Sequence, residues 1–386
     1  MSPTTPPITA ATTVPTSLSS GLSAPSVSGS SLVWTDPQRQ ALFDAWLQLV
    51  QAPHQLRTDT VRLASADASF RRYLRVDSPL AQPSGSFIIM DAPPDKENCT
   101  PFAQVAQLMA EAGIKAPQVL DWDEAHGFML LTDLGAQTMM QVIVPSEAPP
   151  LPLYLEAVDT LIQWQLASRD GVLPPYDRAL LMRELELFPQ WYIGAHRQVT
   201  LNDAQRKTLD SAFETIVKNN LAWPSVYVHR DFMPRNLMIG PGGVAGVHDE
   251  HLGVLDFQDA VYGPITYDIA SLMRDAFLSW DEDFCLDVTI RYWQKARKAG
   301  LPVGDDFGEF YKAVEWMGLQ RHLKVAGIFA RLTLRDGKPQ YLADTPRFIA
   351  YLRATCARYM ELKPLLRLIE QVEGIEIPTA YVFGRT

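Results

Sequence analysis

Two stretches of this chain carry most of its information: His229-Arg230-Asp231-Phe232-Met233-Pro234-Arg235-Asn236 and Leu255-Asp256-Phe257-Gln258-Asp259. Phosphoryl transfer needs a carboxylate that orients and deprotonates the attacking hydroxyl. It also needs an amide oxygen and a second carboxylate that hold the Mg²⁺ bridging the nucleotide phosphates. The complete catalytic-loop pattern, H-R-D followed by four residues and N, is present. We therefore predict a kinase site in which Asp231 is the base and Asn236 and Asp256 hold the metal.

Each of these residues also has a structural alternative. Aspartate and asparagine favour turns, so Asp231 and Asn236 could be turn residues. His229 could be a buried histidine that bonds to the backbone, and within the kinase interpretation we expect it to position the loop in this way. Asp256 fits a structural role less well, because a carboxylate in a buried strand is costly unless it is paired or bound to metal. The complete set favours catalysis.

Arg235 places a positive charge four residues after Asp231. A guanidinium is suited to a bidentate clamp on phosphate or carboxylate groups. We therefore group Arg235 with Asp231 and His229 as catalytic candidates. The alternative is a surface arginine that closes the loop.

Composition indicates a globular protein that does not bind nucleic acid. The chain has 386 residues, of which 47% are hydrophobic, and a formal net charge of −10, whereas phosphate backbones require a basic face. No apolar run reaches the ~18 residues that span a bilayer, and no secretory signal is evident. Three scattered cysteines indicate neither a disulfide framework nor a zinc site. We expect a cytoplasmic protein, a monomer or weak homodimer, with no membrane partner.

The chain divides into a tail and two lobes. Residues 1–33 are mostly Ser, Thr, Pro and Ala, with no charged residue and few large apolar ones, and such a segment cannot bury enough apolar surface to offset its ordering entropy. We predict a disordered tail over 1–33, a nucleotide-binding N-lobe over 34–133, and a helical C-lobe with the catalytic loop and substrate site over 134–386.

The N-lobe pattern predicts three strands, a helix and two further strands. Expected strands cover residues 60–63, 72–76, 87–90, 118–122 and 128–132, with an amphipathic helix over 102–109 and another helix beginning near Pro37 after the cap residue Asp36. From residue 136 onward the periodicity is mostly helical. The fold class we predict is α+β and two-lobed, like a protein kinase: a five-stranded antiparallel sheet with one main helix, and a larger helical lobe.

The nucleotide site departs from the usual kinase pattern. No glycine-rich loop precedes the second strand, although backbone amides of the turn ending at Ser69 could still bind phosphate. The third strand has Met90 where a kinase places its phosphate-binding lysine, and the helix expected to face it offers Gln104 and Gln107 in place of glutamate.

Other residues must then serve the nucleotide. Arg71 and Arg72, with Lys96, are candidates for the phosphates, although each could be a solvated surface charge. Backbone groups of Thr132, Asp133 and Leu134 are expected to form the hinge that meets the adenine edge.

With these motifs, the chain resembles the aminoglycoside phosphotransferase and choline kinase-like superfamily over about residues 55–330. The resemblance is carried by His229-Arg230-Asp231 with Asn236, by Leu255-Asp256-Phe257, and by Tyr267-Asp268-Ile269-Ala270-Ser271-Leu272. It implies ATP and Mg²⁺ as cofactors. It also implies that Asp268 supports the catalytic loop from a helix N-terminus, whereas simple helix capping is the physical alternative.

A narrower resemblance is to the bacterial kinases that phosphorylate amino sugars at C1 during cell-wall recycling. It is carried by residues 67–73, 90–94, 229–232, 256–260 and 323–332. It implies a small-molecule amino-sugar substrate, N-acetylmuramate or N-acetylglucosamine. Arg235, Arg321 and Lys324 are candidates for the acidic group of N-acetylmuramate. The aromatic side chains of Trp191 and Tyr192, with His196, could line a sugar cleft or belong to the core. The rival interpretations are another small-molecule kinase, for aminoglycosides, choline or homoserine, and a nucleotide-binding pseudokinase.

Overall fold

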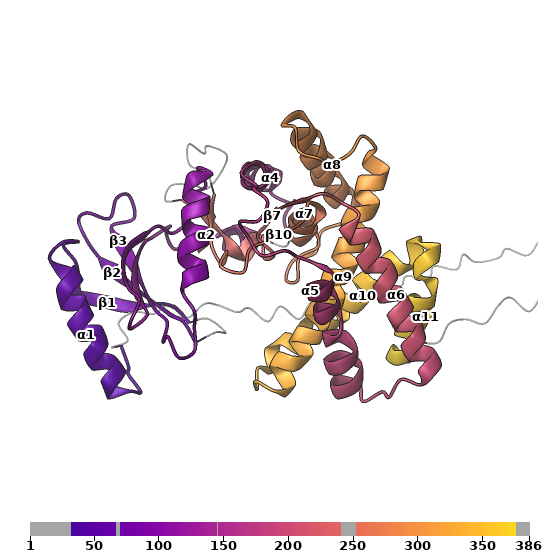
Figure 1. Cartoon of the computed structure of the whole chain (residues 1–386), viewed down its shortest axis with the longest axis horizontal. Helices are drawn as coiled ribbons and strands as arrows, with labels where there is room; N and C mark the ends of the chain where they lie inside the picture. Colours follow the sequence, from indigo (N-terminus) through magenta and orange to yellow (C-terminus); the bar gives the residue numbers. More distant parts are fainter. Residues whose placement is uncertain (1–31, 67–69, 145, 241–251, 376–386) are drawn as a thin grey trace, which may run out of the picture.

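The chain forms two lobes joined by a short connection (Figure 1). The structure, a computed structural model, describes residues 32–66, 70–144, 146–240 and 252–375. Almost all of the expected tail, and Ser69, lie outside these ranges. Within them, no helix is long and apolar enough to cross a membrane.

The N-lobe is built on a five-stranded antiparallel sheet in the order β1-β2-β3-β5-β4. This confirms the predicted strands and their sequence order. The antiparallel register sets Tyr73 opposite Met90 and Met90 opposite Met129. The strands are β1 (Arg57–Ala66), β2 (Arg72–Asp77), β3 (Ser86–Asp91), β4 (Val119–Asp123) and β5 (Phe128–Thr132).

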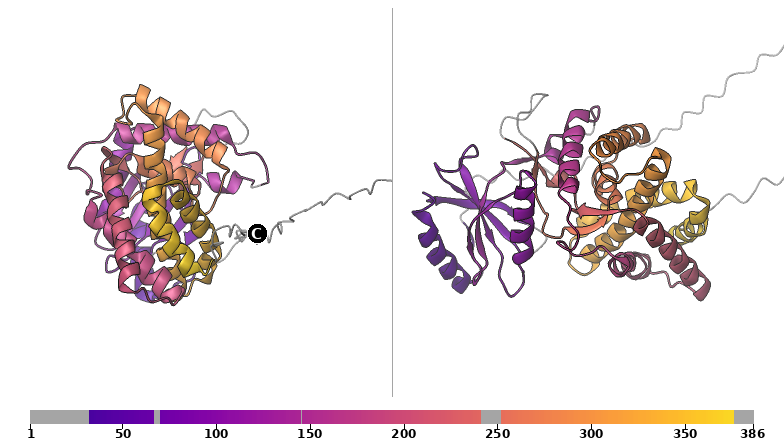
Figure 2. Two further views of the ribbon diagram at one scale, coloured as in Figure 1. Left: turned by 90° about the vertical axis from the view of Figure 1, so that its right-hand side faces the viewer. Right: turned by 45° about the horizontal axis from the view of Figure 1, so that its top comes forward.

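Two helices cover the opposite faces of this sheet (Figures 1 and 2). Helix α1 (Pro37–Gln51) begins where predicted, because the Asp36 carboxylate accepts hydrogen bonds from the amides of Gln38 and Arg39. Its apolar residues form a separate small core with the outer face of the sheet. Helix α2 (Thr100–Glu111) packs on the other face, towards the C-lobe.

The expectation that Gln104 and Gln107 face the third strand is wrong. Both side chains are exposed, and Gln107 donates to Glu111 on its own helix. Met90 instead lies in the core that contains the apolar side of α2. The physical reason is that a helix packs its apolar stripe, here Phe102, Val105, Ala106 and Met109, against the sheet.

The C-lobe is helical, as predicted, apart from short strands that carry the catalytic segments. The paired segments β7–β10 and β6–β8–β9 present the loops that contain Asp231, Asn236 and Asp256. Its strands are β6 (Gln137–Thr138), β7 (Ser225–Val228), β8 (Leu237–Ile239), β9 (Gly253–Val254) and β10 (Val261–Pro264). Its helices are α3 (Met139–Val142), α4 (Leu151–Leu166), α5 (Arg178–Leu185), the π-helix η1 (Phe188–His196), α6 (Asp203–Leu221), η2 (Pro234–Asn236), α7 (Thr266–Met273), α8 (Glu282–Lys298), α9 (Phe307–Leu334), η3 (Pro339–Asp344), α10 (Thr345–Arg358), η4 (Met360–Leu362) and α11 (Lys363–Glu373).

Helix α9 lies at the centre of the C-lobe, between α7, η1 and α10 (Figure 1). Its residues from Ala313 to Lys324 are all buried, polar ones included. Gly327 lets the helix approach the main chain at Leu187, because a Cβ there would stand 2.4 Å from the Leu187 carbonyl. This approach fixes α9 against the segment that links α5 to η1.

We expect Gly327→Ala to lower Tm by about 2–5 °C, because overpacking against rigid backbone costs ~1–3 kcal/mol. Gly318→Ala on the same helix is the matched control. A Cβ at Gly318 makes ordinary contact with Arg274 at 3.4 Å, and alanine favours helix over glycine. Thermal unfolding followed by circular dichroism measures both. Equal Tm values for Gly327→Ala and wild type would contradict the close approach.

Candidate active site

The catalytic loop has a strained backbone that is held by hydrogen bonds to a side chain of helix α7. Arg230 has a φ of +78°, a conformation that costs an L-residue roughly 1 kcal/mol or more. Asp268 of α7 stabilises it, because its two carboxylate oxygens accept from the amide of His229 at 2.7 Å and that of Arg230 at 3.0 Å. Helix α7 begins at Thr266 with Ile265 as its cap, so Asp268 supports the loop and does not cap the helix.

His229 is buried and bridges the two catalytic segments. Its Nε2 donates to the carbonyl of Leu255 at 2.9 Å, and its Nδ1 accepts from the amide of Asp231 at 3.2 Å. Burial lowers the pKa of His229, which fits a neutral ring with one donor and one acceptor nitrogen. The ring thereby ties the loop of Asp231 to the residue that precedes Asp256.

The Asp231 side chain is 37% exposed at the end of this loop. Burial alone would raise the pKa of Asp231, but the positive charges of Lys324, Arg321 and Arg230 outweigh it and hold that pKa below its usual value. Asp231 is therefore a carboxylate at neutral pH, able to accept a hydrogen bond from a hydroxyl.

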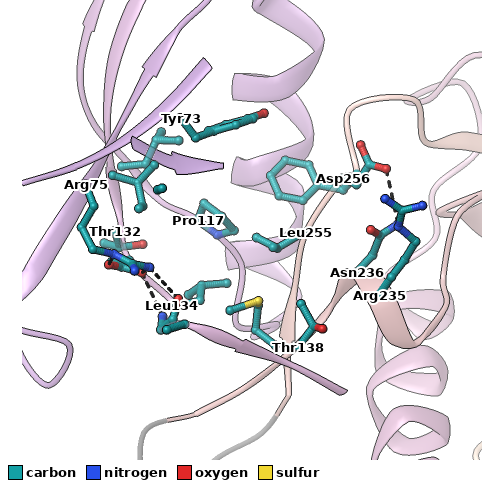
Figure 3. Close-up of a pocket in the computed structure, with 18 of the residues that line it drawn as sticks. Tyr73, Arg75, Pro117, Thr132, Leu134, Thr138, Arg235, Asn236, Leu255 and Asp256 are labelled. Carbon is teal, nitrogen blue, oxygen red and sulfur yellow. Dashed lines mark hydrogen bonds and ion pairs between the residues drawn. The ribbon is translucent and has the colours of Figure 1, made fainter. Parts of the chain in front are cut away.

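Asn236 and Asp256 lie side by side (Figure 3). The Asn236 amide nitrogen donates to the main-chain carbonyl of Asp231 at 2.9 Å and lies 3.3 Å from Asp256 Oδ2. With the nitrogen so engaged, the ligand that Asn236 can offer a cation is Oδ1. A carboxylate and an amide oxygen fit Mg²⁺, which prefers oxygen donors and commonly takes one or two from protein.

A cleft of about 370 Å³ runs between the lobes and ends at these residues. Figure 3 shows Arg75, Thr132 and Leu134 on its N-lobe side and Arg235, Asn236 and Asp256 on its C-lobe side. Its apolar lining includes Ala64, Ile88, Leu131, Met238 and Leu255. A flat aromatic base fits such walls. The predicted hinge residues Thr132, Asp133 and Leu134 all line the cleft.

Sequence reasoning missed the ion pair that fixes the hinge. Arg75 Nε lies 2.6 Å from Asp133 Oδ2, and its Nη2 donates to the Gly135 carbonyl at 2.8 Å. Asp133 also accepts from Ser86 and from the Gly135 amide. Strand alternation offered a signal, because Arg75 lies two residues after Tyr73 and both side chains line the cleft.

The two arginines predicted for phosphate lie in different places. Arg72 points to the far face of the sheet, where its Nη2 pairs with Asp91 at 2.6 Å and its guanidinium stacks on Trp34. The alternation that sends Tyr73 into the cleft sends Arg72 away from it, so Arg72 does not join the candidate site. Arg71 is buried beside Tyr73 and pairs with Glu97 at 3.1 Å.

Of the three cations considered for an acidic substrate, Arg235 is exposed. It lines the cleft, with its guanidinium carbon 4.6 Å from the centre of the Phe277 ring. Arg321 and Lys324 are buried behind the catalytic loop.

The aromatic residues suggested for a sugar cleft belong to the C-lobe core. Tyr192 is buried, stacks on Phe188 and donates to Glu373 at 2.8 Å. His196 lies against Tyr192, and Trp191 packs against the same core.

A buried carboxylate, Glu184 of α5, was not anticipated. It pairs with Arg230 at 2.6 Å and with Lys324 at 2.9 Å, and accepts a short hydrogen bond from Tyr176. Burial would raise the pKa of Glu184, but the charges of Lys324 and Arg230 lower it. No sequence signal distinguishes this glutamate, because its charged partners, Arg230 and Lys324, come from segments far along the chain.

The sequence matches known phosphotransferases. The profile of the "Phosphotransferase enzyme family" covers residues 60–306. The N-acetylmuramate/N-acetylglucosamine kinase of Neisseria meningitidis serogroup B is 46% identical over 349 residues, which are 90% of this chain and 100% of that protein. The protein of the same name from Pseudomonas putida is 45% identical over 344 residues, covering 89% and 95% of the two chains.

Solved structures show the same fold at low sequence identity. The GDP complex of wild-type aminoglycoside 2'-phosphotransferase-IIIa has a TM-score of 0.54 at 14% identity, covering 80% of this chain and 97% of that one. The ethanolamine kinase Pv091845 of Plasmodium vivax has a TM-score of 0.54 at 11% identity, with coverages of 84% and 90%. The predicted two-lobed, protein-kinase-like fold is thereby confirmed.

We expect Asp268→Asn to lower Tm by about 2–6 °C, because an amide nitrogen would face one of the two loop N–H groups and leave it unpaired, at ~1–3 kcal/mol. Asp159→Asn is the control, since Asp159 is an exposed partner of Lys295 and such surface pairs contribute little. Differential scanning calorimetry compares the two. If both variants have the same Tm as the wild-type protein, Asp268 does not support the loop.

Proposed function

This chain belongs to the phosphotransferase enzyme family and, within it, to the N-acetylmuramate/N-acetylglucosamine kinases, and on that premise we propose that it transfers the γ-phosphoryl group of ATP to the anomeric hydroxyl of these amino sugars. One observation carries the proposal: Asn236 and Asp256 line the interlobe cleft side by side, and the Asn236 amide nitrogen donates to the main-chain carbonyl of Asp231. The cytoplasm, where ATP and sugars released from the cell wall are both available, is the proposed compartment.

Asp231 receives the proton of the sugar. Its carboxylate accepts a hydrogen bond from the C1 hydroxyl, which turns an oxygen lone pair towards the γ-phosphorus. It takes the proton as the bond between the sugar oxygen and the γ-phosphorus forms and the bond from that phosphorus to the β-phosphate oxygen breaks, with ADP as the leaving group. An anomeric hydroxyl is more acidic than an ordinary alcohol, so a carboxylate with a low pKa suffices. His229 holds the loop at the required position through its bonds to Leu255 and Asp231.

The nucleotide occupies the cleft with adenine at Thr132, Asp133 and Leu134. Asp256 and Oδ1 of Asn236 would hold Mg²⁺, which when bound neutralises charge on the phosphate oxygens. Asp256 has a φ of +63°, and the surrounding bonds hold its carboxylate beside Asn236. Arg71 is the arginine proposed for the phosphate end.

Arg235 is proposed to meet the anionic part of the reactants. Its exposed guanidinium lines the cleft on the side of Asn236 and Asp256. The lactyl carboxylate of N-acetylmuramate and the transferred phosphoryl group are both suited to a guanidinium clamp. N-acetylglucosamine lacks the carboxylate, so comparing the two sugars separates these roles.

The activity is tested by measuring ADP release with N-acetylmuramate, N-acetylglucosamine, an aminoglycoside and choline. We expect turnover with the two amino sugars and a sugar 1-phosphate product. Phosphorus NMR should show a phosphate on C1. The product should be labile to mild acid and inert to borohydride, because the reducing end is blocked. Turnover with only the aminoglycoside or choline would overturn the substrate assignment, and no nucleotide turnover at all would indicate a pseudokinase.

Two variants should separate catalysis from nucleotide binding: Asp231→Asn should lose the first and Asp256→Ala the second. Asp231→Asn should lower kcat by ~10²–10⁴-fold, because the proton acceptor is lost, while Mg·ATP affinity stays within a few fold. Asp256→Ala should remove Mg-dependent ATP binding, because the carboxylate ligand is lost. Titration calorimetry and steady-state kinetics measure both. Unchanged Mg·ATP binding in Asp256→Ala, or near-normal kcat in Asp231→Asn, would contradict the assigned role.

A further inference from the structure

Arg321 of α9 lies behind the catalytic loop and contacts it directly. Its Nη1 donates a short hydrogen bond to the main-chain carbonyl of Arg230, and its Nη2 is 3.9 Å from Asp231 Oδ1. The guanidinium carbon lies 4.8 Å from the centre of the Tyr267 ring. The Arg321 side chain is 5% exposed and does not line the cleft. Its position indicates a role that acts through the loop.

The loop needs support at this point. Arg230, at φ +78°, immediately precedes Asp231, and the peptide between them sets the direction in which the Asp231 side chain leaves the main chain. Asp268 holds the Arg230 amide at 3.0 Å from one side, and Arg321 holds the Arg230 carbonyl from the other. Such strained conformations persist where their surroundings over-determine them.

We propose that Arg321 is a positioning residue for phosphoryl transfer, which fixes the Arg230–Asp231 peptide from helix α9 and keeps the Asp231 carboxylate turned towards the acceptor hydroxyl. The inference rests on the proposed kinase activity. It assigns Arg321 to the base and not to the lactyl carboxylate of the substrate.

The neighbouring cations have other partners. Lys324, one turn further along α9, binds Glu184 at 2.9 Å and lies 3.4 Å from the Tyr267 hydroxyl. Arg235 is exposed and stacks on Phe277. The bond from Arg321 to the carbonyl before Asp231 thus differs in kind from the contacts of these two side chains.

The first test is a set of three variants assayed with an amino sugar and ATP. Arg321→Met should lower kcat by about 10- to 100-fold, because misplacing a catalytic group by ~1 Å has an effect of that order, with both KM values within about 3-fold. Arg321→Lys keeps a donor and should recover part of kcat. Arg331→Met, about 15 Å further along α9, is the matched control and should behave as wild type. An unchanged kcat in Arg321→Met would overturn the proposal.

The second test asks whether Arg321 acts through Asp231. In an Asp231→Asn background, Arg321→Met should lower the residual single-turnover rate by less than about 2-fold, because no base remains to be positioned. An equal fold-loss in both backgrounds would show that Arg321 acts independently of Asp231 and would overturn the proposal. If Arg321→Met does not fold, Arg321→Lys takes its place in the cycle.

The four proteins of this cycle are the wild type, Arg321→Met, Asp231→Asn and the double variant. They also separate this inference from the proposed function. A wild-type protein that releases no ADP with either amino sugar contradicts the function. The inference is then decided by thermal unfolding, because groups that contact each other give non-additive changes. We expect the Tm change of the double variant to differ from the sum of the single changes by about 1–2 °C. Additive changes would contradict the contact.

Discussion

The site depends on the pair of hydrogen bonds that the Asp268 carboxylate accepts from two successive main-chain amides, those of His229 and Arg230. Without a buried acceptor those N–H groups would be unpaired, and Arg230 would have less reason to keep its left-handed conformation. Burial raises the pKa of Asp268 to about 6. Because this is still below 7, the carboxylate is mostly ionised at neutral pH. One side chain of α7 therefore determines where the catalytic loop runs.

The charged side chains around this loop fix its position more than they add to the free energy of unfolding. Glu184 is paired with Arg230 and Lys324, and Arg321 stands between the loop carbonyl and Asp231. Desolvation offsets much of the attraction within buried ion pairs, so they add little net stability. Their contribution is directional, because each bond restricts the side chain or carbonyl it reaches. The close approach of α9 at Gly327 brings these partners, drawn from distant segments, to one place.

The parts that were predictable from sequence are those with local signals. The five strands, the cap at Asp36 and the loop of Asp231 and Asn236 each follow from residue types at fixed spacing. Arg72 and Arg75 show the limit, because both are basic residues of β2 and only the direction of each side chain decides which one meets the cleft. Glu184 shows another limit, since its charged partners, Arg230 and Lys324, lie 46 residues away or more, and no pattern along the chain connects them.

The replacement of the usual strand lysine by Met90 bears on regulation. Many protein kinases are switched by swinging the helix that carries the glutamate partner, which breaks an ion pair to the lysine and disables the site. In this chain the corresponding strand and helix meet through Met90, Phe102, Val105 and Met109, so that kind of switch has no ion pair to break. The contact between β3 and the apolar side of α2 is thus one of packing, and its strength follows the fit of these side chains.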